Sequence, residues 1–238
     1  MPMRFDILTL FPQLCETVLS ESVIGRAQKS GAIEVRTHNI RDFAGNKHNR
    51  VDDTTYGGGK GMLMAAPPVV ECHEAVLSDK KEGESVYTVY LSPRGNTFDQ
   101  SVAKRLSQYN RLVLISGHYE GIDERAIELV VDEELSIGDY VLTGGEIPAC
   151  IVVDAVARLV PGVLSSDECF EIESFSDGLL EYPQYTRPFE YRGLTVPEVL
   201  ISGNHANIEK WRTEQAKRIT EERRPDILKR SAPEKKKK

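Results

Sequence analysis

The chain has 238 residues, of which 40% are hydrophobic, so it can bury the core of one large domain or of a large and a small one. It has no run of ~18 uninterrupted apolar residues, no signal-peptide start and no paired or chelating cysteines, which favours a cytoplasmic protein with buried thiols and no membrane partner. The net charge of -7 argues against a polyanionic partner for the whole chain, although residues 205–238 hold 12 Lys or Arg against 6 Asp or Glu.

The first part of the chain alternates between apolar runs typical of strands and amphipathic runs typical of helices. Strands are expected at 3–10, 32–38, 86–91 and 111–116. Helices are expected at 12–29, 67–78, 98–108 and 146–159, with Gly31 and Pro161-Gly162 as stop signals. This order predicts an α/β fold with a parallel sheet covered on both faces.

The alternation ends after Gly162. Residues 1–162 are therefore expected to form the large domain and the turn-rich stretch 163–187 a linker. Residues 188–230 are expected to form a small all-helical domain, with helices at 196–201 and 204–223 and a cap at Asn204 or its neighbour. Residues 231–238 are expected to be a disordered basic tail.

Three apolar runs end in glycine-bearing loops: LSPRGN (91–96), SGHYEGIDER (116–125) and SIGDYVLTGG (136–145), the last read as a strand running into two glycines. Ligands of open α/β sheets bind at the carboxyl ends of strands, where glycine lets backbone groups approach closely. The three loops could line one pocket; the alternative is three ordinary turns.

Nucleotide-binding motifs are absent. No G-x-G-x-x-G follows the first strand, which argues against a nicotinamide-dependent reductase, and YGGGKGM (56–62) lacks the P-loop pattern. Lys60 and the nearby Lys47, His48 and Arg50 could contact phosphate, as in RNA binding. The alternative for this segment is a flexible surface loop.

A set of ordered motifs carries a resemblance to a known family: GMLM (61–64), YLSPRG (90–95), YEGIDER (119–125), SIGDYVLTGGE (136–146), PGVL (161–164), ESFSDGLLEYPQYTRP (173–188) and LISGNHANIEKWR (200–212). Over about residues 3–230 the chain closely resembles the bacterial tRNA (guanine-N1)-methyltransferases of the TrmD type, in the SPOUT class. The resemblance implies S-adenosylmethionine-dependent methylation of N1 of the guanine 3′-adjacent to the anticodon, at tRNA position 37. It also implies a deep trefoil knot in the α/β domain, a flexible linker and a helical tRNA-binding domain.

By the same resemblance the glycine-bearing loops are the knotted loops that hold the methyl donor. The residues implied in cofactor binding are Leu91, Pro93, Gly95, Gly117, Tyr119, Glu120, Gly121, Ser136, Ile137, Gly138, Asp139, Tyr140, Val141, Leu142, Gly144, Gly145, Pro148 and Glu181. Glu120 is also implied near a magnesium-linked role, which makes magnesium a further candidate cofactor, although no set of metal ligands is predicted.

The implied catalytic residues are Glu173, as the general base for guanine N1, and Arg158, which would stabilise charge on guanine O6. Without the resemblance, Glu173 reads as a solvated linker acid and Arg158 as the i,i+4 partner of Asp154. The chain departs from the family pattern at Glu173, where the family has Asp, and at His118, where many members have Arg.

The implied partners are tRNA and a second copy of the chain. RNA-binding residues are expected at Lys47, His48, Arg50, Asp53, Lys60, His205, Lys210 and Arg212. A homodimer would let Glu173 of one subunit serve the cofactor of the other, with the helices at 12–29 and 146–159 at the interface. The alternative within the same knotted class is a protein that binds RNA without methylating this guanine.

Overall fold

The computed structural model describes residues 2–165, 173–176 and 178–230, so the predicted tail 231–238 and part of the predicted linker lie outside the described residues. The chain divides into two compact units, Met1–Asp167 and Glu168–Lys238. Cys15, Cys72 and Cys150 are free and buried, as predicted, while Cys169 falls outside the described residues.

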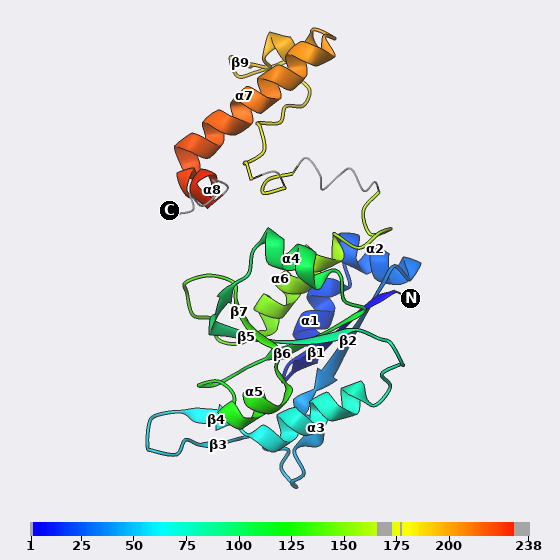
Figure 1. Ribbon diagram of the computed structural model, residues 1–238, viewed down its shortest axis with the longest axis vertical. Helices are drawn as coiled ribbons and strands as arrows, with labels where there is room; N and C mark the ends of the chain where they lie inside the picture. Colours follow the sequence, from blue (N-terminus) through cyan, green and yellow to red (C-terminus); the bar gives the residue numbers. More distant parts are fainter. Residues whose placement is uncertain (1, 166–172, 177, 231–238) are drawn as a thin grey trace, which may run out of the picture. The chain divides into compact units, whose positions relative to one another are not determined.

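The first unit is built on a five-stranded parallel sheet in the order β2-β1-β6-β5-β7 (Figure 1). Its strands are β1 (Met3–Thr9), β2 (Ile33–Asn39), β5 (Val86–Thr97), β6 (Arg111–Ser116) and β7 (Glu133–Ser136). Its helices are α1 (Pro12–Leu19), α2 (Ser22–Ser30), α3 (Ala66–Leu77), α4 (Gln100–Leu106), α5 (Glu124–Val130) and α6 (Glu146–Ala157), with a 3-10 turn η1 (Ile40–Phe43). A separate antiparallel hairpin pairs β3 (Asp52–Thr54) with β4 (Met62–Met64).

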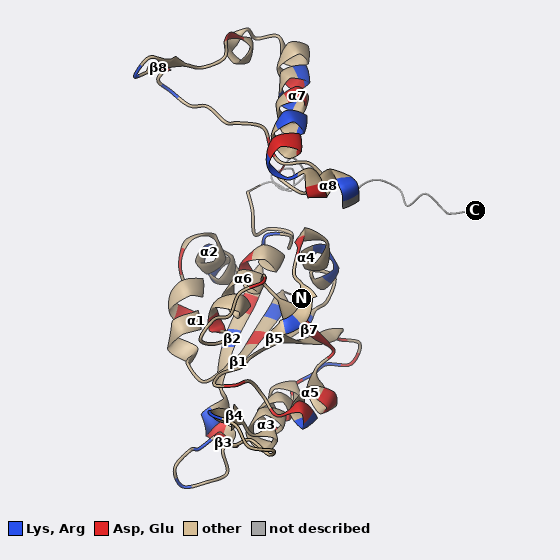
Figure 2. Cartoon of the chain, turned by 90° about the vertical axis from the view of Figure 1, so that its left-hand side faces the viewer, with Lys and Arg blue, Asp and Glu red and all other residues tan. Residues whose placement is uncertain are grey.

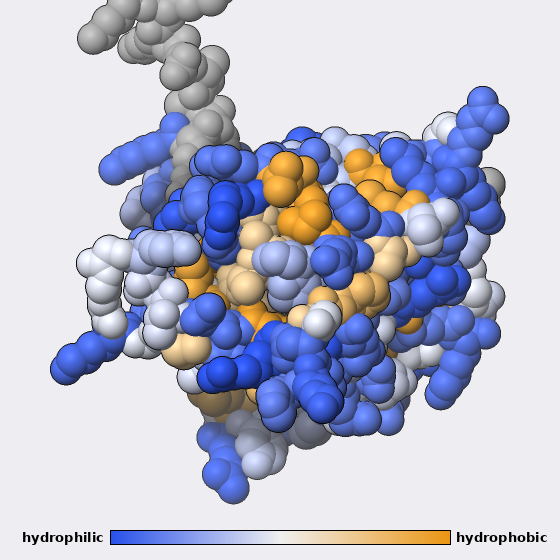
Figure 3. All heavy atoms as spheres, turned by 90° about the horizontal axis from the view of Figure 1, so that it is seen from below, coloured by the Kyte–Doolittle hydropathy of each residue, from blue (hydrophilic) through white to orange (hydrophobic). Residues whose placement is uncertain are grey.

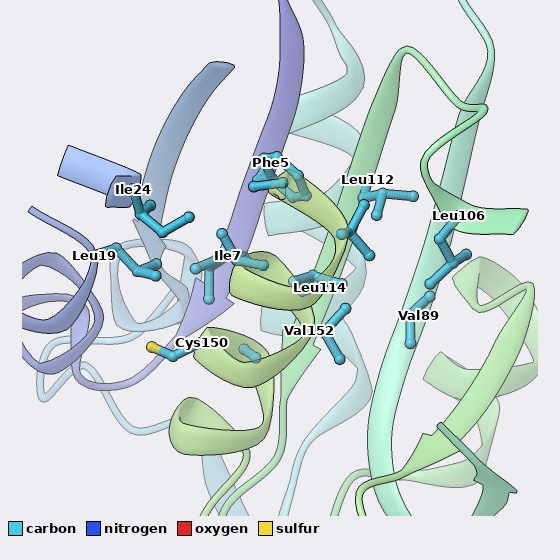
Figure 4. Packing of buried hydrophobic residues seen from close by; sticks show 14 of the residues in the cluster. Phe5, Ile7, Leu19, Ile24, Val89, Leu106, Leu112, Leu114, Cys150 and Val152 are labelled. Atoms are coloured by element: carbon cyan, nitrogen blue, oxygen red, sulfur yellow. The ribbon is translucent and has the colours of Figure 1, made fainter. Parts of the chain in front are cut away.

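Helices cover both faces of the sheet, as the sequence predicts. Along β6, Leu112 and Leu114 belong to a core shared with α1, α2, α4 and α6, whereas Val113 and Ile115 belong to a core shared with α3 and α5. This split follows from the two-residue repeat of a strand, which sends successive side chains to opposite faces. Figure 4 shows Val152 of α6 packed over the first core beside Leu114. Seen from below, the surface is largely hydrophilic, with hydrophobic side chains gathered near the middle (Figure 3).

The helix predicted over 12–29 is wrong as a single element, because the chain turns between α1 and α2. The side-chain amide of Gln28 donates to the Leu19 carbonyl at 2.7 Å and so satisfies a backbone group at the end of α1. The Ser20 carbonyl lies against Gly25, where a Cβ would clash with it. The turn after α1 therefore depends on Gly25 and does not interrupt the helical spacing of apolar residues. This explains why the hydrophobic pattern predicted one helix.

Further corrections concern β5, α5 and the edge strand β7. The stretch 136–143, predicted as a strand, is a loop, because β7 ends at Ser136. The sequence analysis missed both β7 and α5. Both are short and rich in acids, so neither shows a full hydrophobic period. β5 runs past its predicted end to Thr97, with a register shift against β7 between Leu91 and Asn96.

The second unit contains β8 (Glu190–Tyr191), β9 (Leu194–Thr195), the 3-10 turn η3 (Glu198–Ile201), α7 (His205–Arg223) and α8 (Pro225–Arg230). The predicted cap is confirmed, because Asn204 accepts a hydrogen bond from the Asn207 amide at 3.2 Å. The all-helical prediction is wrong, because β8 and β9 form a two-stranded hairpin. Acidic and basic side chains both lie along α7 (Figure 2).

Candidate functional site

Three loops at the carboxyl end of the sheet enclose a cavity of about 520 Å³ within the first unit. They lie at the carboxyl ends of β6, β5 and β7, which are neighbours in the sheet, and the stretch 91–96 proves to be the last part of β5 itself. Of the predicted cofactor residues, all but Gly95, Asp139 and Glu181 line the cavity: Leu91, Pro93, Gly117, Tyr119, Glu120, Gly121, Ser136, Ile137, Gly138, Tyr140, Val141, Leu142, Gly144, Gly145 and Pro148. The three glycine-bearing stretches therefore line one pocket, as the sequence predicted, and are not three separate turns.

Glycine is required where the loops touch each other. A Cβ on Gly95 would press into the β7 backbone at Glu134, and a Cβ on Gly145 would press on the backbone of Ser116. The Gly145 amide donates to the Gly117 carbonyl at 2.9 Å, which joins the loop after β6 to the loop before α6. The three loops are thus packed backbone to backbone, and any side chain at these two positions would force them apart.

The cavity wall is partly apolar and carries few charges. Leu91, Ile137 and Leu142 supply apolar surface, while Glu120 and Glu124 supply carboxylates and Arg94 supplies a guanidinium. Such a cavity suits a small molecule with a flat apolar part and a charged end.

A buried carboxylate lies directly behind the cavity. Glu146 is 3% exposed; its Oε1 accepts a hydrogen bond from Thr9 Oγ1 at 2.7 Å, and its Oε2 lies 3.4 Å from His118 Nε2. Glu146 is the first residue of α6, where a negative charge is favoured by the helix dipole. The His118 ring also packs on Phe11, with 4.9 Å between ring centroids. His118 is thereby fixed at the cavity wall, a role that its family position alone did not indicate.

The β3–β4 hairpin is attached to the loop after β6 by backbone hydrogen bonds. The amides of Glu120 and Asp123 donate to Met62 and Met64 at 3.0 and 2.9 Å, and the Met64 amide donates to Gly121 at 3.0 Å. Leu63 reaches the cavity by this route. The hairpin also carries the predicted RNA-binding residues Asp53 and Lys60, both exposed.

The residues missed by sequence reasoning at this cavity are Leu63, Tyr90, Ser92, Arg94, His118, Ile122, Glu124, Leu135 and Thr143. Most stand beside predicted residues in the same loops, and that adjacency is a signal that could have found them. No local sequence signal points to Leu63, because it reaches the cavity through a tertiary contact between the β3–β4 hairpin and the loop after β6.

The predicted catalytic residues are not among those that line this cavity. Arg158 caps the carboxyl end of α6, ten residues beyond Pro148, which at 1.5 Å per residue is about 15 Å along the helix. Glu173 and Glu181 belong to the second unit. There the Ser176 amide donates to the Glu173 carbonyl at 3.2 Å, and the Glu181 amide donates to Ser174 Oγ at 2.9 Å.

The predicted RNA contacts fall in two places. Lys47, His48 and Arg50 are exposed on a loop of the first unit, held by Asn46, whose Oδ1 accepts hydrogen bonds from the amides of His48 and Arg50. In the second unit, His205, Lys210 and Arg212 lie on α7.

Lys210 and Arg212 are paired within their helix. Lys210 Nζ lies 4.0 Å from Glu214, and Arg212 lies 3.5 Å from Glu209 and stacks over the Tyr182 ring at 5.0 Å. Surface pairs of this kind are weak, so these cations stay available to phosphate.

Within the residues that the structure describes, no group of three or more His, Cys, Asp or Glu side chains is arranged to hold a metal ion. Across the same residues, no helix is both long and apolar enough to cross a membrane.

Comparison with known proteins identifies the family. A model of the family tRNA (Guanine-1)-methyltransferase TrmD matches residues 3–230. A tRNA (guanine-N(1)-)-methyltransferase of Ruminiclostridium cellulolyticum is 54% identical over 226 residues, covering 95% of this chain and 96% of the relative. A protein of the same name from Clostridioides difficile is 52% identical, covering 96% of this chain and 99% of the relative. The chain belongs to the tRNA (Guanine-1)-methyltransferase TrmD family, whose members are methyltransferases.

Proposed function

We propose that this enzyme transfers a methyl group from S-adenosylmethionine to N1 of the guanine 3′-adjacent to the anticodon, at tRNA position 37. The observation that carries the proposal is the convergence of three glycine-bearing loops on one cavity in a member of this family. The family and the names of its relatives support the base and the atom that are methylated, and tRNA as the substrate.

The cavity residues fit S-adenosylmethionine. The cavity has a volume of about 520 Å³, which lies in the usual range for small-molecule sites. Apolar side chains and loop backbone can surround an adenosine, and the carboxylates of Glu120 and Glu124 offer negative charge to a sulfonium and an ammonium group. When bound, this cofactor supplies an electrophilic methyl group. No phosphate is present in it, which accounts for the missing nucleotide-binding motifs.

Glu173 is the proposed general base. A carboxylate in hydrogen-bond reach of guanine N1 accepts the N1 proton as that nitrogen takes the methyl group, so no free anion has to form. Arg158 is proposed to donate hydrogen bonds to guanine O6, where negative charge grows as N1 loses its proton. Glu181 is proposed to bind the amino end of the cofactor.

We further infer a homodimer with active sites shared between subunits. Exposed apolar side chains gather on the adjacent helices α1 and α6 and just before α1, namely Phe11, Leu14, Val18, Ile147 and Ile151. Exposed apolar side chains on two adjacent helices are typical of an interface. In this dimer Glu173 of one subunit would serve the cofactor bound by the other.

The remaining parts of the family architecture complete the proposal. Residues 1–162 would form the cofactor-binding domain with its trefoil knot, 163–187 the linker and 188–230 the tRNA-binding domain. Lys47, His48, Arg50, Asp53, Lys60, His205, Lys210 and Arg212 would contact the tRNA, and the enzyme would act in the cytoplasm. The chemistry proposed for Glu173 and Arg158 does not depend on these domain bounds, tRNA contacts or this location.

The proposal predicts a single methylated base. Unmodified tRNA incubated with the protein and radiolabelled S-adenosylmethionine should gain one label, which nuclease mapping should place on N1 of the guanine after the anticodon. A tRNA with adenine at that position is the control and should gain none. Label at another base would refute the proposed substrate, and tight tRNA binding without transfer would favour a non-catalytic RNA-binding protein.

The shared-site proposal predicts complementation between two inactive variants. Gly145→Ala should disrupt the cavity, because its Cβ would press on the Ser116 backbone, and Glu173→Gln should remove the base. Mixed dimers then contain one intact cavity served by one intact Glu173, so an equal mixture should recover roughly a quarter of wild-type activity. No recovery, with subunit exchange verified by mass spectrometry, would show that each chain uses its own Glu173.

A further inference from the structure

The cavity wall carries one arginine, Arg94, beside the carboxylates of Glu120 and Glu124. Arg94 belongs to the part of β5 that shifts register against β7, and its amide donates to Ser92 Oγ at 3.2 Å. Among the described residues that line the cavity, it is the only Lys or Arg. Its side chain is 59% exposed, so its charged end is accessible to solvent and to a ligand.

The Arg94 guanidinium is held from one side. Its Nη2 donates to Glu124 Oε2 at 3.1 Å and to Glu134 Oε1 at 3.2 Å. Glu124 begins α5 and Glu134 belongs to β7, so two separate elements fix the group. Its Nε and Nη1 have no hydrogen-bond partner among the residues that the structure describes. A guanidinium that is anchored at Nη2 and keeps N–H groups on Nε and Nη1 can still donate a hydrogen bond to a carboxylate.

We propose that Arg94 is a specificity-determining residue that binds the carboxylate of the amino-acid tail of the methyl donor. The inference rests on the proposed function, because it takes S-adenosylmethionine as the ligand of the cavity. That tail carries one carboxylate beside two cationic groups. The cavity offers one guanidinium in Arg94 and the carboxylate of Glu120, besides the Glu124 carboxylate that pairs with Arg94.

The competing explanation is an ordinary surface ion pair that only ties loop to strand. Exposed pairs contribute little, and neutralising such an arginine would leave ligand binding unchanged. The two explanations differ in whether the loss depends on the ligand's carboxylate. A comparison of two ligands that differ only in this group therefore separates them.

The test measures binding by calorimetry, without turnover. Wild-type protein should bind S-adenosylmethionine about tenfold more tightly than decarboxylated S-adenosylmethionine, and Arg94→Gln should bind both with the weaker affinity. Arg105→Gln is the matched control, because Arg105 pairs at 2.6 Å with Glu133, the neighbour of Glu134 on β7, but does not line the cavity. It should keep the wild-type preference.

Each outcome is decisive for a different claim. If Arg94→Gln keeps the preference for the carboxylate-bearing ligand, or weakens both ligands equally, Arg94 does not read that group and the inference is refuted. If the wild-type protein binds neither ligand, the proposed function itself fails. Arg94→Lys keeps the charge but loses the fork, and an intermediate preference in that variant would support recognition by the guanidinium.

Discussion

Glu173→Gln is expected to lower the rate of methyl transfer by at least about 100-fold while the affinity for S-adenosylmethionine stays within about twofold. The glutamine side chain has nearly the same shape as glutamate, but its amide cannot accept the N1 proton. Glu173 lies in the second unit, whereas the proposed cofactor cavity is lined by residues of the first. The loss should therefore appear in the chemical step and leave cofactor binding intact.

The measurement is single-turnover transfer of labelled methyl groups to tRNA, with calorimetry for the cofactor. Glu190→Gln is the control, because Glu190 is an exposed acid in β8 of the same unit, and it should keep the wild-type rate. Glu173→Asp keeps the carboxylate with one methylene fewer and should retain activity within about tenfold. A Gln variant that transfers methyl groups at the wild-type rate would remove Glu173 from the base role.

The sequence predicted the layers of the first unit because its longer elements carry a strong hydrophobic period. Residues 112–115 of β6 form an unbroken apolar run, and the whole strand proves to be buried. Two of the missed elements, α5 and β7, have seven and four residues and hold Glu124, Glu128, Glu133 and Glu134. Their place is set by pairing with β5 and by packing on α3, which are contacts between distant segments.

The same limit applies to the site. The glycine-bearing loops could be predicted, because parallel strands bring their carboxyl ends to one edge. The hydrogen bond between Thr9 and Glu146 joins residues 137 positions apart, and no local pattern signals it. The roles proposed for Glu173 and Arg158 come from family resemblance alone, since neither residue type nor spacing distinguishes them from ordinary surface charges.

A large loss of stability is expected when the buried ion pair between β1 and β6 is broken. Asp6 of β1 and Arg111 of β6 are both fully buried, and Arg111 Nε donates to Asp6 Oδ2 at 2.7 Å. Arg111 also donates to Asp79 at 2.8 Å and to the Val76 carbonyl near the end of α3 at 2.6 Å. Arg4 Nη2 donates to Asp6 Oδ1 at 2.9 Å. This cluster fastens two strands to the end of α3, and within it Asp6 and Arg111 are fully desolvated whereas Asp79 is half-exposed.

Asp6→Asn should lower the free energy of unfolding by about 3–5 kcal/mol, because it leaves the buried Arg111 without its buried counter-ion. Urea unfolding measures this change. Glu34→Gln, which breaks the exposed pair between Glu34 and Arg36, is the control and should cost less than about 1 kcal/mol. The double variant Asp6→Asn with Arg111→Met should cost less than the sum of its single changes, since no unpaired buried charge remains.

The pH dependence of stability provides an independent check on the same cluster. Burial opposes ionisation of Asp6, but hydrogen bonds from His38 and Arg4 and the charge of Arg111 outweigh it, so its pKa lies below the ordinary value of 3.8. Hydrogen bonds from Arg4 and Arg111 likewise lower the pKa of Asp79. A carboxylate with a depressed folded pKa stabilises the fold above its unfolded pKa and loses that contribution as the pH falls through the folded value. Stability should therefore drop below about pH 4, and the drop should be shallower in Asp6→Asn. Equal pH slopes in variant and wild type would show that Asp6 does not carry this linkage.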